Sequence, residues 1–126
     1  MTEDLDALLD GSRRSGVYRI GPGESSLAGR LSAAGWRTVV VVEPFDDLNG
    51  FYDRIAGDLG FPGYFGRNLD ALWDSLTDLI DPTAVIIKDW SRFAVPQPAD
   101  WQRLLSVLED RTRQGAPFAV LLTGPE

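Results

Sequence analysis

The sequence of 126 residues predicts an α/β protein built on a small, mainly parallel β-sheet. The strongest signals are three short apolar runs with the composition of buried strands: 38–43, 84–90 and 118–122. Segments with helical hydrophobic periodicity separate these runs. Because strands that are joined through helices run parallel, we expect a three-stranded parallel sheet packed with helices. A further run at 16–20 predicts a fourth strand from the N-terminal region.

The N-terminal region is expected to contribute this added strand and a short helix. Residues 1–15 are polar and unpatterned, which fits either a frayed arm or a short helix. The segment GVYRI (16–20) favours a strand, and GPGESS (21–26) favours a turn that leads into a helix. Apolar residues at helical spacing follow, and Gly35 is expected to end this helix.

The middle of the chain predicts two helices joined by an aromatic loop. The first helix is capped by Asp46 or Asp47 and ends at a glycine. The segment FPGYFG (61–66) combines turn residues with three aromatic side chains and is expected to be a loop. A second helix is predicted to begin at Asn68 and to run to about Ile80.

The C-terminal third predicts a loop, a long helix and the last strand. The segment 91–98 contains two prolines and is expected to be a loop. Trp101 and three leucines at helical spacing predict a long helix that ends before Gly115. Arg111 and Arg113 lie in its last turn, where positive charge favours the helix macrodipole. With no linker, repeat or low-complexity tract, residues 1–126 are expected to form a single domain.

The composition excludes several chemistries and localises the charge. The chain has 19 acidic and 12 basic side chains and a net charge of −7. The segment 43–81 holds nine acidic residues and two arginines, so it carries the whole net charge. Without His or Cys there is no Ser-His-Asp or Cys-His catalysis and no imidazole or thiolate metal ligand. Phosphates repel an acidic chain, so a basic protein is the expected partner, and nucleic acid is not.

Targeting signals and cofactor motifs are not evident. No apolar run reaches the roughly 18 residues of a membrane span, and the acidic start of the chain does not resemble a signal peptide. The Gly-rich segment 21–26 lacks the Lys-Ser/Thr pair of a phosphate-binding loop. We therefore expect a cytoplasmic protein with no membrane contact, no cofactor, no metal and no small-molecule substrate.

The second predicted helix has two distinct faces. At about 100° per residue, one apolar stripe is expected to be buried: Leu69, Leu72, Leu76, Leu79 and Ile80. Asp70, Asp74 and Thr77 fall on an adjacent polar stripe, with Trp73 between the two. Asp70 and Asp74 are like charges one turn apart, and Asp78 extends the row with no basic residue at the pairing positions. Such a row destabilises an isolated helix by a few tenths of a kcal/mol, so it favours an external positive partner.

Three other interpretations of these acids stay open. They could form an ordinary solvated face, with Asp70 favouring the positive N-terminal end of the helix dipole. A pair of carboxylates could act as general acid and base, although an exposed helix offers no obvious cleft to separate their pKa values. The pair could also hold Ca²⁺ or Mg²⁺, although the sequence has no DxDxDG loop and no third dedicated ligand nearby.

The segment FPGYFGRNLDALWDSLTDL (61–79) closely resembles the signature of the barstar family, the intracellular inhibitors of the bacterial ribonuclease barnase. The matching positions are Pro62, Tyr64, Gly66, 68–74, Leu76 and Thr77. The order of strands and helices also agrees, over residues 38–123. The resemblance implies a three-stranded parallel sheet packed with helices as a barstar-like core. Residues 1–37 fall outside it and are expected to form an N-terminal extension, a strand plus a short helix.

The resemblance also implies which residues bind the partner. In the family, the second helix and the loop before it block the active site of the nuclease. Asp74 matches the central acid of the family, which lies where the substrate phosphate would bind. The implied contact residues in the loop, on the helix and at the rim are Tyr64, Gly66, Asn68, Asp70, Trp73, Asp74, Thr77, Asp78, Leu79 and Asp110.

The sequence departs from the family pattern at the rim of this surface. Leu79 stands where barstar has a contacting Trp, and Asp110 stands where it has a longer Glu. Gln114 and Arg67 each replace an acid. These changes imply a cognate enzyme other than barnase.

We therefore expect an inhibitor without catalytic activity that forms a 1:1 heterodimer with a small secreted ribonuclease. The expected target is guanyl-specific and barnase-like, with a basic active-site pocket that receives the acidic helix. The alternatives are an immunity protein that uses the same face against a different toxin, and a carboxylate or metal-dependent hydrolase.

Overall fold

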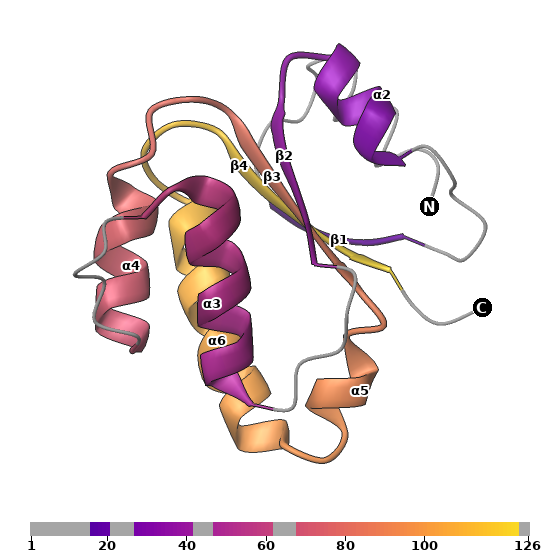
Figure 1. Cartoon of the computed structure of the whole chain (residues 1–126), viewed down its shortest axis with the longest axis vertical. Helices are drawn as coiled ribbons and strands as arrows, with labels where there is room; N and C mark the ends of the chain where they lie inside the picture. Colours follow the sequence, from indigo (N-terminus) through magenta and orange to yellow (C-terminus); the bar gives the residue numbers. More distant parts are fainter. Residues whose placement is uncertain (1–15, 21–26, 42–46, 62–67, 124–126) are drawn as a thin grey trace.

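The fold class predicted from the sequence is confirmed by the structure. In the computed structural model, the described residues are 16–20, 27–41, 47–61 and 68–123. They form one parallel sheet with the strand order β1-β4-β3-β2 (Figure 1). The bounds of the strands are β1 (Gly16–Ile20), β2 (Arg37–Val41), β3 (Thr83–Lys88) and β4 (Phe118–Thr123). The expected fourth strand is β1, which extends the sheet at the free edge of β4.

Five helices are described, and they cover both faces of the sheet. Their bounds are α2 (Leu27–Ala33), α3 (Leu48–Leu59), α4 (Leu69–Thr77), α5 (Ser91–Ala94) and α6 (Pro98–Thr112). Figure 1 shows α2 on one face and α3, α4 and α6 on the other. The chain passes from β1 at one edge to β2 at the opposite edge and then returns through β3 to β4. Because parallel crossovers are right-handed, this reversal of direction moves the helices to the opposite face.

Each face of the sheet has its own hydrophobic core. The larger cluster lies between the sheet and the helices α3, α4 and α6, and it includes Phe51, Leu72 and Leu104. The smaller cluster lies under α2 and includes Leu31 and Trp36. The central strands β3 and β4 contribute to both clusters, and five of the six residues in each are buried. This two-sided burial explains their continuous apolar sequences.

Local signals place the start and end of α3 where the sequence suggested. The sequence predicted either Asp46 or Asp47 as the N-cap. In the structure the N-cap is Asp47, whose side chain accepts a hydrogen bond from the backbone N–H of Gly50 at 3.0 Å. Gly60 ends the helix with φ of 69°, a left-handed conformation that glycine adopts without steric cost.

Two predictions about element bounds were wrong. The acidic helix was expected to continue to about Ile80, but α4 ends at Thr77 and Asp78 is its C-cap. As a result, Ile80 is 85% exposed, although the helical pattern placed it on the buried stripe. The segment 91–98 was expected to be a loop, yet it contains the short helix α5, followed by α6 with Pro98 in its first turn.

Candidate functional site

The helix α4 is held rigidly by its start and by its inner face. The side chain of Asn68 caps it and accepts a hydrogen bond from the backbone N–H of Ala71 at 2.7 Å. Leu72 and Leu76 are fully buried in the larger core. Burial of a leucine side chain contributes about 1.5–3 kcal/mol, so these two contacts fix which face of α4 points outwards.

The outward face of α4 presents a row of acidic side chains. Asp70, Asp74, Thr77 and Asp78 are all exposed. Among the described residues, no basic side chain forms an ion pair with any of the three aspartates, whereas other surface acids pair with arginines. The hydroxyl of Thr77 donates to the backbone oxygen of Asp74 at 2.8 Å. Within the described part of the protein, no positive side chain therefore neutralises the negative charge of this face.

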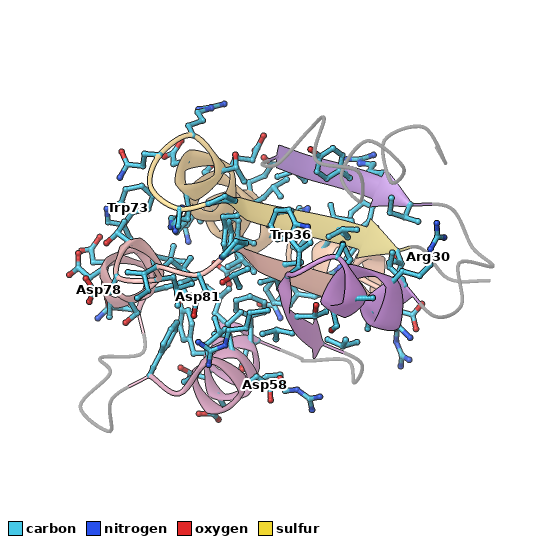
Figure 2. The ribbon with its side chains drawn as sticks, turned by 90° about the horizontal axis from the view of Figure 1, so that it is seen from above. Arg30, Trp36, Asp58, Trp73, Asp78 and Asp81 are labelled. Atoms are coloured by element: carbon cyan, nitrogen blue, oxygen red, sulfur yellow. The ribbon has the colours of Figure 1, made fainter. Side chains whose placement is uncertain are left out.

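Trp73 is half-buried, between the inner and outer faces of α4. Figure 2 shows Trp73 on the side of α4 nearer α6 and Asp78 on its outer side. Trp is one of the residue types enriched in interface hot spots. The contact of this surface with a partner stays a prediction.

The other residues of the predicted binding set lie in three different situations. Tyr64 and Gly66 are outside the described residues. Leu79 is half-buried and packs against the larger core, so its side chain is largely occupied within the protein. Asp110, on α6, is exposed and accepts a hydrogen bond from the Arg113 guanidinium at 3.2 Å. The three aspartates of α4 thus share one surface, and Asp110 comes from the neighbouring helix.

Arg111 is a structural residue whose role the sequence reasoning missed. It was expected only to favour the helix dipole from the last turn of α6, but its side chain is buried, with 1% exposed. Its guanidinium donates hydrogen bonds to four carbonyl oxygens, and its charge lies 5.2 Å from the centre of the Phe118 ring. Burial lowers the pKa of this group. The available signal was its spacing, because Arg111 continues the buried stripe of Leu104 and Leu108.

The four acceptors of Arg111 join two parts of the fold. Two of them are the carbonyl oxygens of Leu76, at 2.7 Å, and Leu79, at 3.4 Å, at the end of α4. The other two belong to Gln114, at 2.5 Å, and Ala116, at 2.9 Å, in the connection from α6 to β4. The carbonyl oxygen of Leu76 also accepts from the backbone N–H of Leu79 at 3.2 Å, so Arg111 adds a charged donor at the carboxyl end of α4, where positive charge favours the helix dipole. Arg111 therefore fixes where α4 ends.

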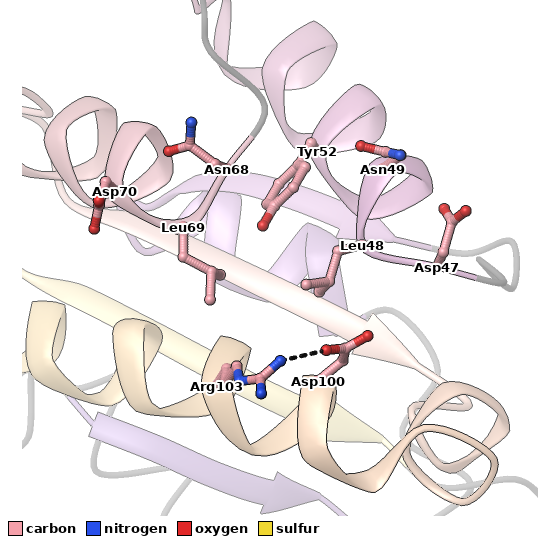
Figure 3. A pocket seen from close by; sticks show the side chains of 9 residues that line it. All are labelled: Asp47, Leu48, Asn49, Tyr52, Asn68, Leu69, Asp70, Asp100 and Arg103. Carbon is pink, nitrogen blue, oxygen red and sulfur yellow. Dashed lines mark hydrogen bonds and ion pairs between the residues drawn. The ribbon is translucent and has the colours of Figure 1, made fainter.

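An open cleft lies between the N-terminal ends of α3, α4 and α6 (Figure 3). Its volume is about 490 Å³, and its lining residues are Asp47, Leu48, Asn49, Tyr52, Asn68, Leu69, Asp70, Asp100 and Arg103. Arg103 is paired with Asp100 at 3.0 Å. Burial, and secondarily the charge of Asp100, raises the pKa of Tyr52. Asp70 lies at the edge of this cleft and also on the acidic row.

The described residues give no support to a metal site. No group of three or more His, Cys, Asp or Glu within them lies close enough together to hold a metal ion. Asp70 and Asp74 are both exposed, so they do not occupy the contrasting environments that separate a catalytic acid from a catalytic base.

In the described part of the chain, no helix has the length and apolar character needed to cross a membrane.

Comparison with known proteins adds two findings. The model of a family described as "Barstar (barnase inhibitor)" matches residues 37–123. A Bacillus subtilis (strain 168) protein named "Putative ribonuclease inhibitor YrdF" is 43% identical over 47 residues, which cover 36% of this chain and 52% of that protein. The match thus spans about half the length of this relative.

Proposed function

The chain belongs to the barstar family, and from this premise we propose that it inhibits a ribonuclease by covering the active site of the enzyme. In this proposal, the exposed face of α4 and the loop before it enter the pocket that binds RNA phosphate. The name of the Bacillus subtilis relative, a ribonuclease inhibitor, agrees with this role. The chain would act by binding alone, in a 1:1 complex, without catalysis of its own.

The observation that carries the proposal is the acidic row of α4, for which the described residues provide no ion-pair partner, on a helix whose opposite face is buried in the core. A ribonuclease binds the phosphates of RNA with arginine and lysine side chains. A carboxylate on a rigid helix can accept the same charge-assisted hydrogen bonds. Asp74 is the middle acid of the row, and we assign it the place of the substrate phosphate. Asp70, Thr77 and Asp78 would surround it, and Trp73 and Tyr64 would add aromatic contact area.

The charge distribution supports the class of target. The net charge of −7 lies within the segment that contains α3 and α4, so the field of the protein is strongest around the proposed surface. Such a field would attract an enzyme with a basic pocket and speed its association at low salt. We therefore propose a small secreted guanyl-specific ribonuclease as the target, and a cytoplasmic location for the inhibitor. The departures from the family pattern at Leu79 and Asp110 support a ribonuclease other than barnase. An immunity role against a different toxin, bound by the same face, is the alternative.

The decisive experiment is a titration of the purified protein against a panel of small microbial ribonucleases, with RNA cleavage as the readout. Asp74→Asn keeps the shape of the side chain and removes its charge. Loss of a buried charged hydrogen-bond partner costs about 2–5 kcal/mol, so we expect at least about 30-fold weaker inhibition.

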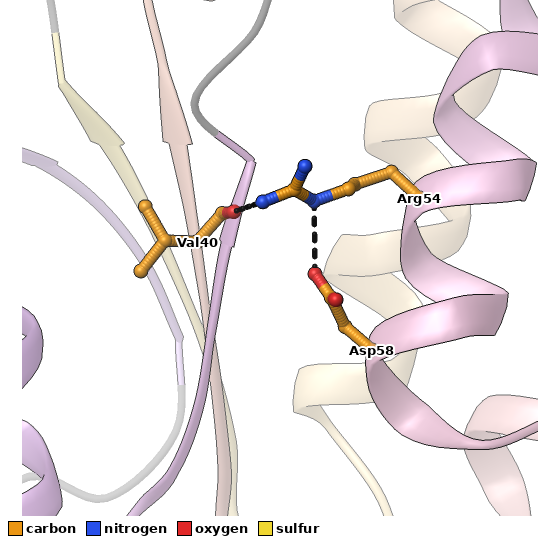
Figure 4. Close-up of polar contacts among 3 residues, drawn as sticks. All are labelled: Val40, Arg54 and Asp58. Carbon is orange, nitrogen blue, oxygen red and sulfur yellow. Dashed lines mark hydrogen bonds and ion pairs between the residues drawn. The ribbon is translucent and has the colours of Figure 1, made fainter.

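Asp58→Asn is the matched control because it changes the net charge by the same amount on a different helix. Asp58 lies on α3 and accepts a hydrogen bond from Arg54 at 3.0 Å, while Arg54 also donates to the carbonyl oxygen of Val40 (Figure 4). We expect Asp58→Asn to inhibit like the wild-type protein. Equal and small losses for both variants would refute the role of Asp74 as a phosphate mimic.

A further inference from the structure

Two large apolar side chains in the described part of the chain are strongly exposed. Ile80 is 85% exposed and Val95 is 77% exposed. A single exposed apolar residue is ordinary on a protein surface, so exposure alone has no functional meaning. The two differ in position. Ile80 lies two residues after Asp78, the C-cap of α4 and the last acid of the row, whereas Val95 is the C-cap of α5.

The exposure of Ile80 is a consequence of how its neighbours are held. On one side, the carbonyl oxygen of Leu79 accepts from Arg111, and the Leu79 side chain packs into the larger core. On the other side, the carbonyl oxygen of Asp81 accepts from the Thr83 hydroxyl at 2.9 Å. The carbonyl oxygen of Pro82 accepts from the backbone N–H of Arg37 at 2.7 Å.

These contacts tie both ends of a short tip, which we define as residues 78–81. Ile80 cannot turn towards the core unless the hydrogen bonds on one side of it break. Within this tip, the half-buried Leu79 side chain packs against the core and the Ile80 side chain is exposed to solvent. Rigid presentation lowers the entropy cost of binding, because little freedom remains to be lost.

The surroundings of Ile80 match the anatomy of a protein interface. Asp78 and Asp81 lie on either side of it in sequence, and both are exposed. Asp78, the C-cap of α4, continues the acidic row of Asp70 and Asp74, and Asp81 lies beyond the helix (Figure 2). An apolar contact bordered by polar groups is the usual arrangement at the centre or edge of a specific interface. The acidic residues near Ile80 would complement basic residues of an enzyme, and Ile80 itself would complement an apolar patch between those basic residues.

We propose that Ile80 is the apolar anchor through which the tip 78–81 binds the same ribonuclease; the resemblance had already assigned Asp78 and Leu79, but not Ile80, to the contact surface. This inference rests on the proposed function. The family resemblance assigned an apolar contact to Leu79, but the structure turns Leu79 towards the core and presents Ile80 instead. Ile80 would pack against an apolar part of the enzyme beside its basic pocket, while α4 occupies the pocket itself.

The test compares two matched substitutions in the full-length protein, Ile80→Thr and Val95→Thr. Both keep a β-branched side chain, and each makes one exposed apolar residue polar. Affinity is measured against whichever enzyme the panel titration shows to be inhibited. We expect Ile80→Thr to weaken binding about tenfold, through faster dissociation with an unchanged association rate, and Val95→Thr to bind like the wild type.

The outcomes separate this inference from the proposed function. If the wild-type protein inhibits but Ile80→Thr and Val95→Thr bind equally well, the anchor is refuted and the proposed function stands. A drop in the urea midpoint of Ile80→Thr alone would also refute it, because Ile80 would then be packed in the free protein. If the wild-type protein inhibits none of the enzymes, the proposed function falls and the anchor falls with it.

Discussion

The substitution Arg111→Met tests whether one buried side chain holds α4 in place. Methionine keeps an unbranched side chain, two heavy atoms shorter than that of arginine, but removes the positive charge and all five N–H donors. It can also keep a contact with the Phe118 ring, which the Arg111 charge approaches to 5.2 Å. The change therefore removes the hydrogen bonds to the carbonyl oxygens and keeps part of the packing of the side chain.

The magnitude follows from the lengths of these bonds. Three of them are short, to Gln114 at 2.5 Å, Leu76 at 2.7 Å and Ala116 at 2.9 Å, while the bond to Leu79 is 3.4 Å long. A hydrogen bond from a charged donor contributes about 1.5–3 kcal/mol, which gives about 4.5–9 kcal/mol for the three. Removing a buried charge offsets several kcal/mol of this by relieving its desolvation. We expect a net loss of about 2–5 kcal/mol in the free energy of unfolding.

The assay is urea unfolding followed by tryptophan fluorescence, and Arg113→Met is the matched control. Arg113 lies two residues away, is exposed and pairs only with Asp110 among the described residues. An exposed ion pair contributes about 0–1 kcal/mol, so the control is expected to unfold almost like the wild type. If Arg111→Met lost less than about 1 kcal/mol, or no more than Arg113→Met, Arg111 would not hold α4 and our account of its end would be wrong.

Two further predictions concern salt and pH. The association rate with the inhibited ribonuclease should fall as NaCl rises from about 20 to 500 mM, because salt screens the field of the acidic segment. The rate is measured by stopped flow. A rate independent of salt would contradict electrostatic attraction of the enzyme by this segment. Burial and the charge of Asp100 raise the pKa of Tyr52 above its ordinary 10.0, so the unfolded chain loses this proton at a lower pH than the folded protein. The free energy of unfolding should therefore fall as pH rises above about 10, and it should fall less steeply in Tyr52→Phe. Urea titrations between about pH 9 and 11 measure this dependence. If the free energy of unfolding fell equally steeply with pH in the wild type and in Tyr52→Phe, the contribution of Tyr52 would be excluded.

The strands and the acidic face could be predicted because their signals are local. The apolar runs that form β3 and β4 are buried on both faces, and GVYRI matches the bounds of β1. Helical spacing separated Leu72 and Leu76, which are buried, from Asp70 and Asp74, which are exposed. These predictions needed only neighbours within a few residues along the chain.

The end of α4 could not be predicted because a distant residue determines it. Arg111 binds the carbonyl oxygens of Leu76 and Leu79 from 35 and 32 positions away in sequence. Periodicity continued the helix through Ile80, since nothing within that segment marks an end before Pro82. The exposure of Ile80 follows from the same tertiary contact, so the sequence could not reveal the tip either.

Arg111 also explains how α4 can carry its acidic row. Asp78 lies at the carboxyl end of the helix, where a negative charge is unfavourable for the helix dipole, and it adds to the repulsion between Asp70 and Asp74. A buried positive charge on the carbonyls of the same helix end offsets both effects from inside the protein, without pairing with the exposed carboxylates. The stabilising charge is thus kept away from the outer face, and no described basic residue occupies the three carboxylates, which we assign to an external positive group. A surface arginine in an ion pair with Asp78 would stabilise α4 as well, but it would occupy one of the carboxylates that we assign to the ribonuclease.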